Sequence, residues 1–302
     1  MKLFDQQQIH RRFLRLAYKM APFNLKGSWD PSLQGPPKAI LWSCLIISNR
    51  PKELDLLLED ICWQNLEATK FEVIIINDGA GAGLREVVER YKGRLNVIYR
   101  ENKDAHRVLS DLRNETLTMS GGKYIAFLDD DTRIIQKDFL SKAAALFEKQ
   151  EADVLLASAQ PLYGIIKAKY DFLDRFSFAC RCCLYRREYL EDLGAFKANL
   201  NCYEDVELSM RLIIKEARIL EAEELEYLHP PLYFESMRKP LSTGQAIFQM
   251  KAHYSFFVWL LIYLHTLRFL PYGISPNKIS RQWFKISWGL LLFPFMGRSY
   301  YY

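Results

Sequence analysis

Short apolar runs alternate with amphipathic stretches along the first half of the chain. Ala39–Ile47, Phe71–Ile76 and Tyr124–Leu128 are rich in aliphatic and aromatic residues, which is typical of buried strands, and Asn96–Tyr99 and Asp153–Ala159 fit two more. The stretches between them predict helices, over 53–63, 84–91, a segment containing Arg113-Asn114, and 137–149. This rhythm predicts parallel βαβ units, whose ligands bind beyond the carboxyl ends of the strands.

Polar residues follow three of these strands where a ligand is expected. Asn49 comes after the first, Asp78 after the second, and Asp129, Asp130 and Asp131 after the run that begins at residue 124. Three adjacent carboxylates cannot stay buried unpaired. If the strand continues through them, Asp129 and Asp131 point to one side and Asp130 to the other. Mg²⁺ or Mn²⁺, held by carboxylates and substrate phosphates, explains the cluster. The alternative is a solvated acidic turn that caps the next helix.

A second group of candidate residues begins a predicted helix. Phe178–Tyr185 reads as another strand, and the spacing of later apolar residues starts a helix at Glu204-Asp205. Acids there either complement the helix dipole or supply a catalytic base, because a first turn is rigid yet open to a cleft. His229 follows a predicted strand or hairpin over 217–228, and the two prolines after it fix its backbone. A lone His is usually not a ligand, but this one could project back to the metal.

A basic segment precedes the acidic strand. Lys103, His106, Arg107 and Arg113 could approach a phosphate group, and the alternative is that each is a solvated side chain. Taken alone, His106 is better interpreted as structural.

Together these motifs resemble the inverting nucleotide-sugar glycosyltransferases of family 2. The resemblance covers roughly residues 39–235, and each motif is weak alone but specific in this order and spacing. The motifs are Ser48-Asn49-Arg50-Pro51, Ile76-Asn77-Asp78-Gly79, Arg113-Asn114, Phe127-Leu128-Asp129-Asp130-Asp131, Leu193-Gly194-Ala195-Phe196, Tyr203-Glu204-Asp205-Val206-Glu207-Leu208 with Arg211-Leu212, and Tyr227-Leu228-His229. The resemblance implies an α/β GT-A fold, in which a Rossmann-like nucleotide-binding half and an acceptor-binding half surround one mixed, mainly parallel sheet.

The resemblance also implies roles for individual residues. Asp78 would contact the nucleotide base, Asp129 the ribose and the metal, Asp131 the metal, and Asp205 would be the general base, with His229 a further metal ligand. On this reading the donor is bound by Asn49, Arg50, Asp78, Arg107, Arg113, Asp129 and Asp130, the metal (Mn²⁺ or Mg²⁺) by Asp129, Asp131 and His229, and catalysis falls to Asp205 with Glu204. A UDP-sugar is the favoured donor, and a saccharide or a lipid-linked molecule the acceptor.

The chain departs from the family pattern in two places. Ile47-Ser48 replaces the usual Thr-Tyr, which alters the wall beside the base. The segment from Asn102 to Arg113 is about three residues longer than usual and lacks its glycine, which leaves the roles of Lys103, His106 and Arg107 open.

Basic residues are concentrated at the two ends of the 302-residue chain. Residues 1–26 have six basic residues and one acid, and residues 236–302 have eight basic residues and none acidic, so the middle is acidic. This distribution argues against a nucleic-acid binder, whose basic residues would lie on the folded domain. It favours a domain held against an anionic membrane surface. We divide the chain into an arm and linker (1–38), a GT-A domain (39–235) and a helical region (236–302).

Apolar residues at both ends fit interfacial helices. Residues 9–20 predict a basic amphipathic helix, for which a packing arm is the alternative. The apolar runs 254–264 and 286–297 are too short to span a bilayer, and the alternative for them is that they complete the core or contact another subunit. No amino-terminal run resembles a signal peptide, and the cysteines show no disulfide framework. We therefore expect a cytoplasmic protein, peripheral on the inner face of the plasma membrane.

Two other functions compete with this interpretation. A haloacid dehalogenase-type phosphatase also has a strand ending in Asp-x-Asp, but it would need Thr or Val in place of Arg133. A catalytically silent, glycosyltransferase-like binding or scaffold subunit is the other alternative, and the retained acids and His229 argue against it.

Overall fold

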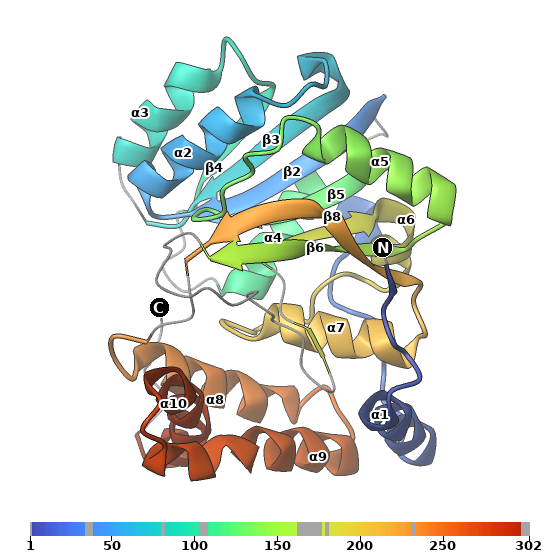
Figure 1. The fold of residues 1–302 in the computed structure, drawn as a ribbon, viewed down its shortest axis with the longest axis vertical. Helices are drawn as coiled ribbons and strands as arrows, with labels where there is room; N and C mark the ends of the chain where they lie inside the picture. The colour runs from blue at the N-terminus through green and yellow to red at the C-terminus, as the bar shows by residue number, and fades with distance from the viewer. Residues whose placement is uncertain are drawn as a thin grey trace.

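One mixed β-sheet runs through the middle of the molecule and carries the candidate site on one edge (Figure 1). The computed structural model describes residues 2–33, 39–79, 82–102, 108–161, 177–178, 181–230 and 234–296. Within these ranges the strands are β1 (Lys2–Leu3), β2 (Ile40–Ser48), β3 (Phe71–Asn77), β4 (Val97–Glu101), β5 (Gly122–Asp129), β6 (Val154–Pro161), β7 (Cys182–Arg186) and β8 (Ile219–His229). The helices are α1 (Ile9–Met20), α2 (Pro51–Cys62), α3 (Ala82–Tyr91), α4 (Leu109–Met119), α5 (Phe139–Gln150), α6 (Arg187–Asp192), α7 (Glu204–Ile214), α8 (Arg238–Met250), α9 (Phe256–Thr266) and α10 (Lys278–Leu292), with 3₁₀ turns η1 (Pro31–Leu33), η2 (Ala68–Lys70), η3 (Leu267–Ile274) and η4 (Phe293–Phe295).

The strand order is β1-β8-β6-β7-β5-β2-β3-β4 among the described residues. Strands β5, β2, β3 and β4 are parallel, which confirms the βαβ prediction. Strand β7 is antiparallel to both β5 and β6, and β8 is parallel to β6. The segment predicted as a strand or hairpin before His229 is one strand, and β7 begins at Cys182, within the strand predicted over 178–185.

Apolar side chains fill both faces of the central strands, as their unbroken hydrophobic runs predict. Cys44 and Ala126 point to the face covered by α2, α3 and α5. Leu45 and Phe127 point to the opposite face, where α4, α6 and α7 pack. The buried Phe196 packs edge-on against Phe127, with ring centroids 5.0 Å apart, so the turn that ends at Phe196 is anchored to this face of the sheet.

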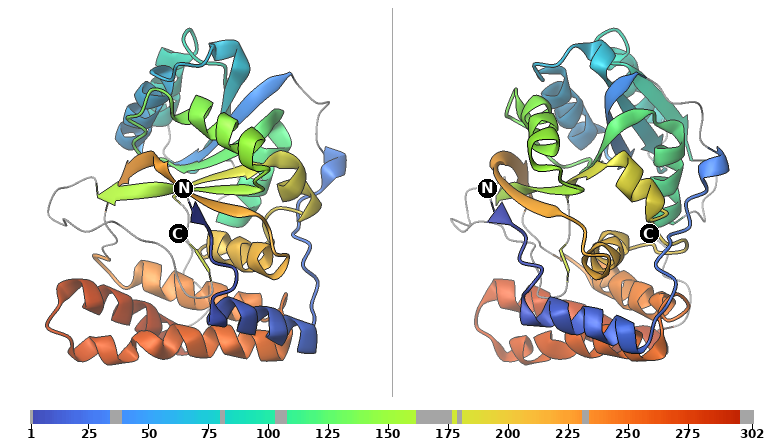
Figure 2. Two further views of the ribbon diagram at one scale, coloured as in Figure 1. Left: turned by 45° about the vertical axis from the view of Figure 1, so that its right-hand side comes forward. Right: turned by 90° about the vertical axis from the view of Figure 1, so that its right-hand side faces the viewer.

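The C-terminal helices form a further layer below α7 (Figure 1). Helices α8 and α10 approach closely through Gly244 and Gly289: a Cβ on Gly289 would lie 2.3 Å from the carbonyl oxygen of Pro240. Helix α1, from the other end of the chain, contacts α9 and lies beside this layer in both views of Figure 2. The two basic ends of the sequence therefore meet in one layer.

One expectation about the C-terminal region is wrong. Helix α9 continues directly into η3, so the apolar helix runs from Phe256 to Ile274 and is 19 residues long. Among the described residues it alone is long and apolar enough to cross a membrane by length and composition. Most of the apolar run over 254–264 is thus part of a longer helix, so the length of that run no longer argues against a membrane span.

Candidate active site

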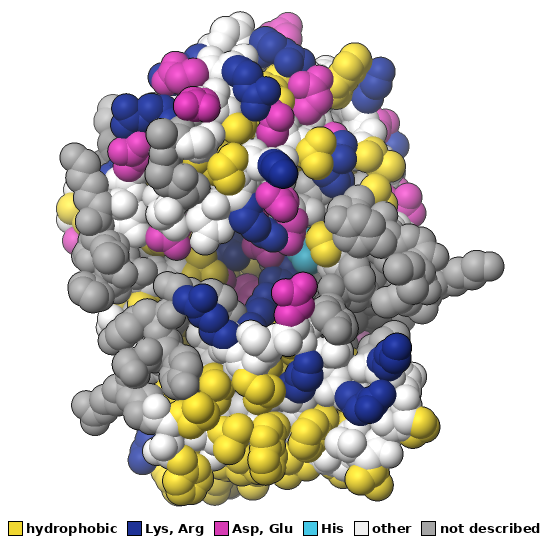
Figure 3. Space-filling view, turned by 90° about the vertical axis from the view of Figure 1, so that its left-hand side faces the viewer, with side chains coloured by type: hydrophobic (Ala, Val, Ile, Leu, Met, Phe, Trp, Pro, Cys, Tyr) yellow, Lys and Arg dark blue, Asp and Glu magenta, His cyan; other side chains and the backbone are white. Residues whose placement is uncertain are grey.

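The carboxyl ends of β2, β3 and β5 bring the first group of predicted residues together. In the strand register Ser48 pairs with Asn77 and Ile47 with Asp129, so Asn49, Asp78 and the three aspartates emerge at one edge. All of them line a cavity of about 920 Å³. Figure 3 shows this face, where acidic, basic and histidine side chains gather in a hollow above an apolar area.

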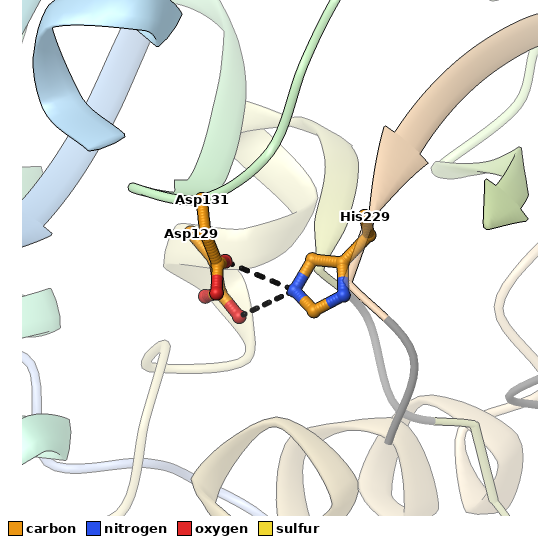
Figure 4. Close-up of side chains that lie close together, drawn as sticks. All are labelled: Asp129, Asp131 and His229. Atoms are coloured by element: carbon orange, nitrogen blue, oxygen red, sulfur yellow. Dashed lines mark ion pairs between the residues drawn. The ribbon is translucent and has the colours of Figure 1, made fainter. Parts of the chain in front are cut away.

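Asp129, Asp131 and His229 converge inside this cavity (Figure 4). The His229 Nε2 atom lies 3.0 Å from Oδ1 of Asp131 and 4.0 Å from Oδ2 of Asp129, and the possible ligand atoms all lie within 4.8 Å of one another. The Nδ1 atom of His229 is 2.6 Å from the carbonyl oxygen of Pro230, which fixes the ring with Nε2 toward the acids. Two carboxylates and an imidazole form a donor set that suits Mn²⁺ or Mg²⁺ chemically.

A short backbone bridge explains why His229 reaches the acids. Strand β8 is not a neighbour of β5, but Arg133 and Leu228 exchange backbone hydrogen bonds of 2.9 Å in both directions. This bridge joins the chain just after Asp131 to the residue just before His229. The predicted projection of His229 toward the acids is therefore present in the structure.

Asp130 points away from this group, as strand alternation predicts. Its buried carboxylate accepts a 2.7 Å hydrogen bond from the Ser48 hydroxyl and pairs with the guanidinium of Arg50. Arg50 also reaches Asp131 at 2.9 Å. Burial alone would raise the pKa of Asp131, but the hydrogen bond and charge of His229, together with Arg50, hold it well below its usual range. Asp130 thus anchors Arg50 across the mouth of the site.

Two arginines hold Asp129 from different sides. Nη2 of the buried Arg113 lies 3.2 Å from Oδ1, and Nη1 of Arg181 lies 3.1 Å from Oδ2. Burial would raise the pKa of Asp129, and the positive charges of Arg181 and Arg113 lower it. Arg113 also donates a 2.9 Å hydrogen bond from Nε to Glu204, so it connects the acidic strand end to helix α7.

The two acids at the start of α7 occupy different surroundings. Glu204 is 3% exposed and paired with Arg113, whereas Asp205 is partly open to the cavity. Burial raises the pKa of Glu204 to about 7, although Arg113 opposes the shift. Tyr203, just before them, has a left-handed backbone with φ 69°, uncommon for a large side chain. This strained turn aims the first turn of α7 at the cavity.

The remaining predicted site residues either line the cavity or lie outside the described residues. Asp78 lines the cavity and accepts a 2.9 Å hydrogen bond from the Asn102 amide, and the exposed Asn49 lines it as well. Arg107, with Lys103 and His106, lies outside the described residues. The five cysteines within the described ranges form no disulfide with one another.

Sequence reasoning missed several residues of the cavity. Arg181, just before β7, lines the cavity but belongs to no sequence motif that could have identified it as a site residue. The C-terminal region supplies a whole wall, which includes Lys239, Arg268, Phe269 and Trp283. The signal of this region in the sequence was its basic and aromatic composition. We interpreted that composition as favouring a membrane surface, with completion of the core or a subunit contact as the alternative.

Comparison with known proteins finds similarity to glycosyltransferases. Residues 44–161 match the family model "Glycosyl transferase family 2". A curated relative, poly(ribitol-phosphate) β-N-acetylglucosaminyltransferase TarS of Staphylococcus aureus, is 28% identical over 116 residues, which are 38% of this chain and 20% of TarS. The chain thus spans about a fifth of the length of that relative.

Solved structures agree on the fold. TarS 1–349 in complex with UDP-GlcNAc has a TM-score of 0.56 at 19% identity, over 84% of this chain and 72% of that one. Mannosyltransferase PcManGT from Pyrobaculum calidifontis, in complex with GDP-Man and Mn²⁺, has a TM-score of 0.59 at 15% identity, over 96% of both chains. The fold is the GT-A fold of glycosyltransferases. Residues 44–161 thus match glycosyl transferase family 2, and the fold of the described residues agrees with that match.

Proposed function

We propose that this chain transfers a sugar, with inversion at the anomeric carbon, from a nucleoside-diphosphate sugar to a hydroxyl acceptor, and that it needs a divalent cation. The observation that carries the proposal is the convergence of Asp129, Asp131 and His229 in a cavity that Asp205 also lines. The resemblance favours UDP as the nucleotide, while PcManGT has GDP-Man bound, so both nucleotides belong in the test.

Asp129, Asp131 and His229 are the residues that would hold Mn²⁺ or Mg²⁺. When bound, the cation supplies positive charge that offsets the charge developing on the departing diphosphate. Arg50 holds Asp131 in place, and Arg113 holds Asp129, so the two carboxylates are positioned before any ligand binds. Asp78 lies at the end of β3, where it is available to the nucleotide base.

Asp205 is the group best placed to accept the proton of the acceptor hydroxyl as it attacks. It is partly open to the cavity on the rigid first turn of α7. Direct displacement with one base needs no covalent nucleophile and inverts the anomeric centre. Glu204 is buried against Arg113, so we assign it to positioning this turn and not to proton transfer.

The test is a screen of UDP- and GDP-sugars for nucleotide release in Mn²⁺, with and without EDTA, followed by two variants. Asp205→Asn should keep donor affinity while kcat falls about 100-fold or more, because a base acts only in the transition state. In the matched control, Glu204→Gln, kcat should fall less than in Asp205→Asn. Nucleotide-sugar binding without turnover would favour the silent-subunit alternative, and absence of any binding would contradict the proposal.

We also propose that the chain is a peripheral protein on the cytoplasmic face of the plasma membrane, with a saccharide or a lipid-linked molecule of the cell envelope as acceptor. Large apolar side chains of α1 and of the C-terminal layer are exposed, among them Ile9 at 73%, Met20 at 69%, Phe256 at 63% and Ile274 at 93%. The stripe predicted on α1 therefore faces outward, while Leu14 and Ala17 face the protein. Because residues 236–302 contain no acid, an anionic bilayer complements this layer in charge.

Sedimentation with vesicles tests this attachment. The full chain should bind vesicles containing phosphatidylglycerol more strongly than neutral ones, and high salt or alkaline carbonate should release it from native membranes. Extraction by detergent alone would show instead that the apolar helix from Phe256 to Ile274 spans the bilayer.

A further inference from the structure

The cavity has two sides of different chemistry. On the side of the sheet it is lined by charged groups, among them Asp129, Asp131 and Arg113. On the side of the C-terminal layer it is lined by large apolar side chains, which we call the aromatic wall: Phe234 after β8, Phe269 and Tyr272 of η3, and Trp283 and Ile286 of α10. A cavity with one ionic and one apolar side suits a ligand that has a polar and an apolar part.

The aromatic wall is held together by its own contacts. The ring centroids of Phe269 and Trp283 are 5.1 Å apart, and those of Phe269 and Tyr272 are 5.8 Å apart. The backbone N–H of Phe234 donates a 2.9 Å hydrogen bond to the Gln282 side chain of α10. The wall is therefore formed in advance, and a ligand does not have to assemble it.

The donor does not account for the aromatic wall. A nucleoside-diphosphate sugar has no long apolar part, and we place its base at the end of β3, beside Asp78. The wall also differs from a platform for a single sugar ring, because the Arg268 guanidinium already covers one face of Phe269 at 3.9 Å from the ring centroid. Ile286 has no ring to offer. Burial of apolar surface is therefore the interaction that the wall supplies.

The aromatic wall continues from the cavity onto the exposed apolar layer. Tyr272 lines the cavity and is also 44% exposed, and Ile274, further along η3, is almost fully exposed. Figure 3 shows the hollow above an apolar area on the same face. An apolar chain bound along the wall would therefore leave the cavity beside the layer that we propose lies on the bilayer.

We propose that the aromatic wall binds the apolar chain of a lipid-linked acceptor, whose polar head carries the reacting hydroxyl toward Asp205. The inference rests on the proposed function and narrows its acceptor, because a plain saccharide has no part that would use the wall. The residues of the wall lie outside residues 44–161, so the family match assigns them no role.

Calorimetry on the full chain tests the proposal with two probes that share a head group, methyl β-glucoside and octyl β-glucoside, the latter below the concentration at which it forms micelles. Phe269→Gln places a polar side chain in the wall. Phe256→Gln makes the same change in the same continuous helix, but in the exposed layer outside the cavity, and is the matched control. Tyr272→Gln is a second wall variant, since a half-exposed position tolerates a polar side chain. Circular dichroism checks that each variant is folded.

Octyl glucoside should bind wild type at least about 100-fold more tightly than methyl glucoside, because its longer chain takes more apolar surface out of water. Its binding should weaken about tenfold or more in Phe269→Gln and at least about threefold in Tyr272→Gln. Phe256→Gln should stay within about twofold of wild type. Equal binding of the two glucosides, or no binding of octyl glucoside, would overturn the inference. So would an equal loss in Phe256→Gln, which would show adsorption to the exposed layer.

Nucleotide titration separates this inference from the proposed function. UDP or GDP in Mn²⁺ should bind Phe269→Gln as tightly as wild type, because the wall serves the acceptor. A parallel loss of nucleotide affinity would assign the wall to the donor and overturn the inference. A wild-type protein that binds neither nucleotide would contradict the proposed function itself, whatever the result with octyl glucoside.

Discussion

Replacing the buried Glu207 by Gln should destabilise the protein more than replacing a charged residue on the surface would. Glu207 and Arg211, one turn apart on α7, are both fully buried and joined by bonds of 2.7 and 2.8 Å. Arg211 also donates to backbone carbonyls that include Leu193 and Ala195, and the Tyr254 hydroxyl donates to Glu207 at 2.9 Å. The network therefore ties α7, which carries Asp205, to the turn after α6 and to the C-terminal layer.

The expected size of the effect follows from burial. Glu207→Gln keeps the shape of the side chain but leaves the Arg211 guanidinium buried without a counter-charge, which typically costs about 3–5 kcal/mol. Urea unfolding followed by circular dichroism measures this loss. The control is Glu101→Gln, which breaks the exposed pair with Arg85 and should cost less than about 1 kcal/mol. A loss below about 1 kcal/mol for Glu207→Gln would refute the reasoning.

Two further predictions concern packing and pH. Gly289→Ala should lower the free energy of unfolding in urea by about 1–3 kcal/mol, because the added Cβ would meet the backbone of Pro240. The control is Gly93→Ala, which has open space around it and should cost little. Equal effects of the two variants would contradict the close approach of α8 and α10. The raised pKa of Glu204 means that between its ordinary value near 4.5 and about 7 the folded state binds a proton that the unfolded state has released. Wild-type Tm should therefore fall relative to that of Glu204→Gln as pH rises through about 7, and a pH-independent difference would contradict the shift.

The sequence predicts the parallel half of the sheet well because its signals are local. Unbroken apolar runs mark β2, β3 and β5, and period-two alternation correctly separates Asp130 from Asp129 and Asp131. The antiparallel insertion of β7 between β5 and β6 was not predictable in this way, because pairing between distant strands leaves no local pattern.

Features that depend on tertiary contacts were only partly predictable. The reach of His229 depends on the backbone bridge between Arg133 and Leu228, which has no sequence signature. Periodicity revealed the apolar stripe of α1 but not that it faces outward, since the opposite side packs through Leu14 and Ala17. Likewise, the basic composition of the C-terminal region could not show that Lys239 lines the cavity.

The central claim is that Asp129, Asp131 and His229 bind the cation that a nucleoside-diphosphate sugar requires. Calorimetric titration of UDP and GDP into wild type and Asp131→Ala, each in Mn²⁺ and in EDTA, tests it most directly. We predict that wild type binds one nucleotide only when Mn²⁺ is present, and that Asp131→Ala loses this binding while remaining folded by circular dichroism. Equal affinity of the two proteins in Mn²⁺, or wild-type binding that EDTA leaves unchanged, would contradict the claim.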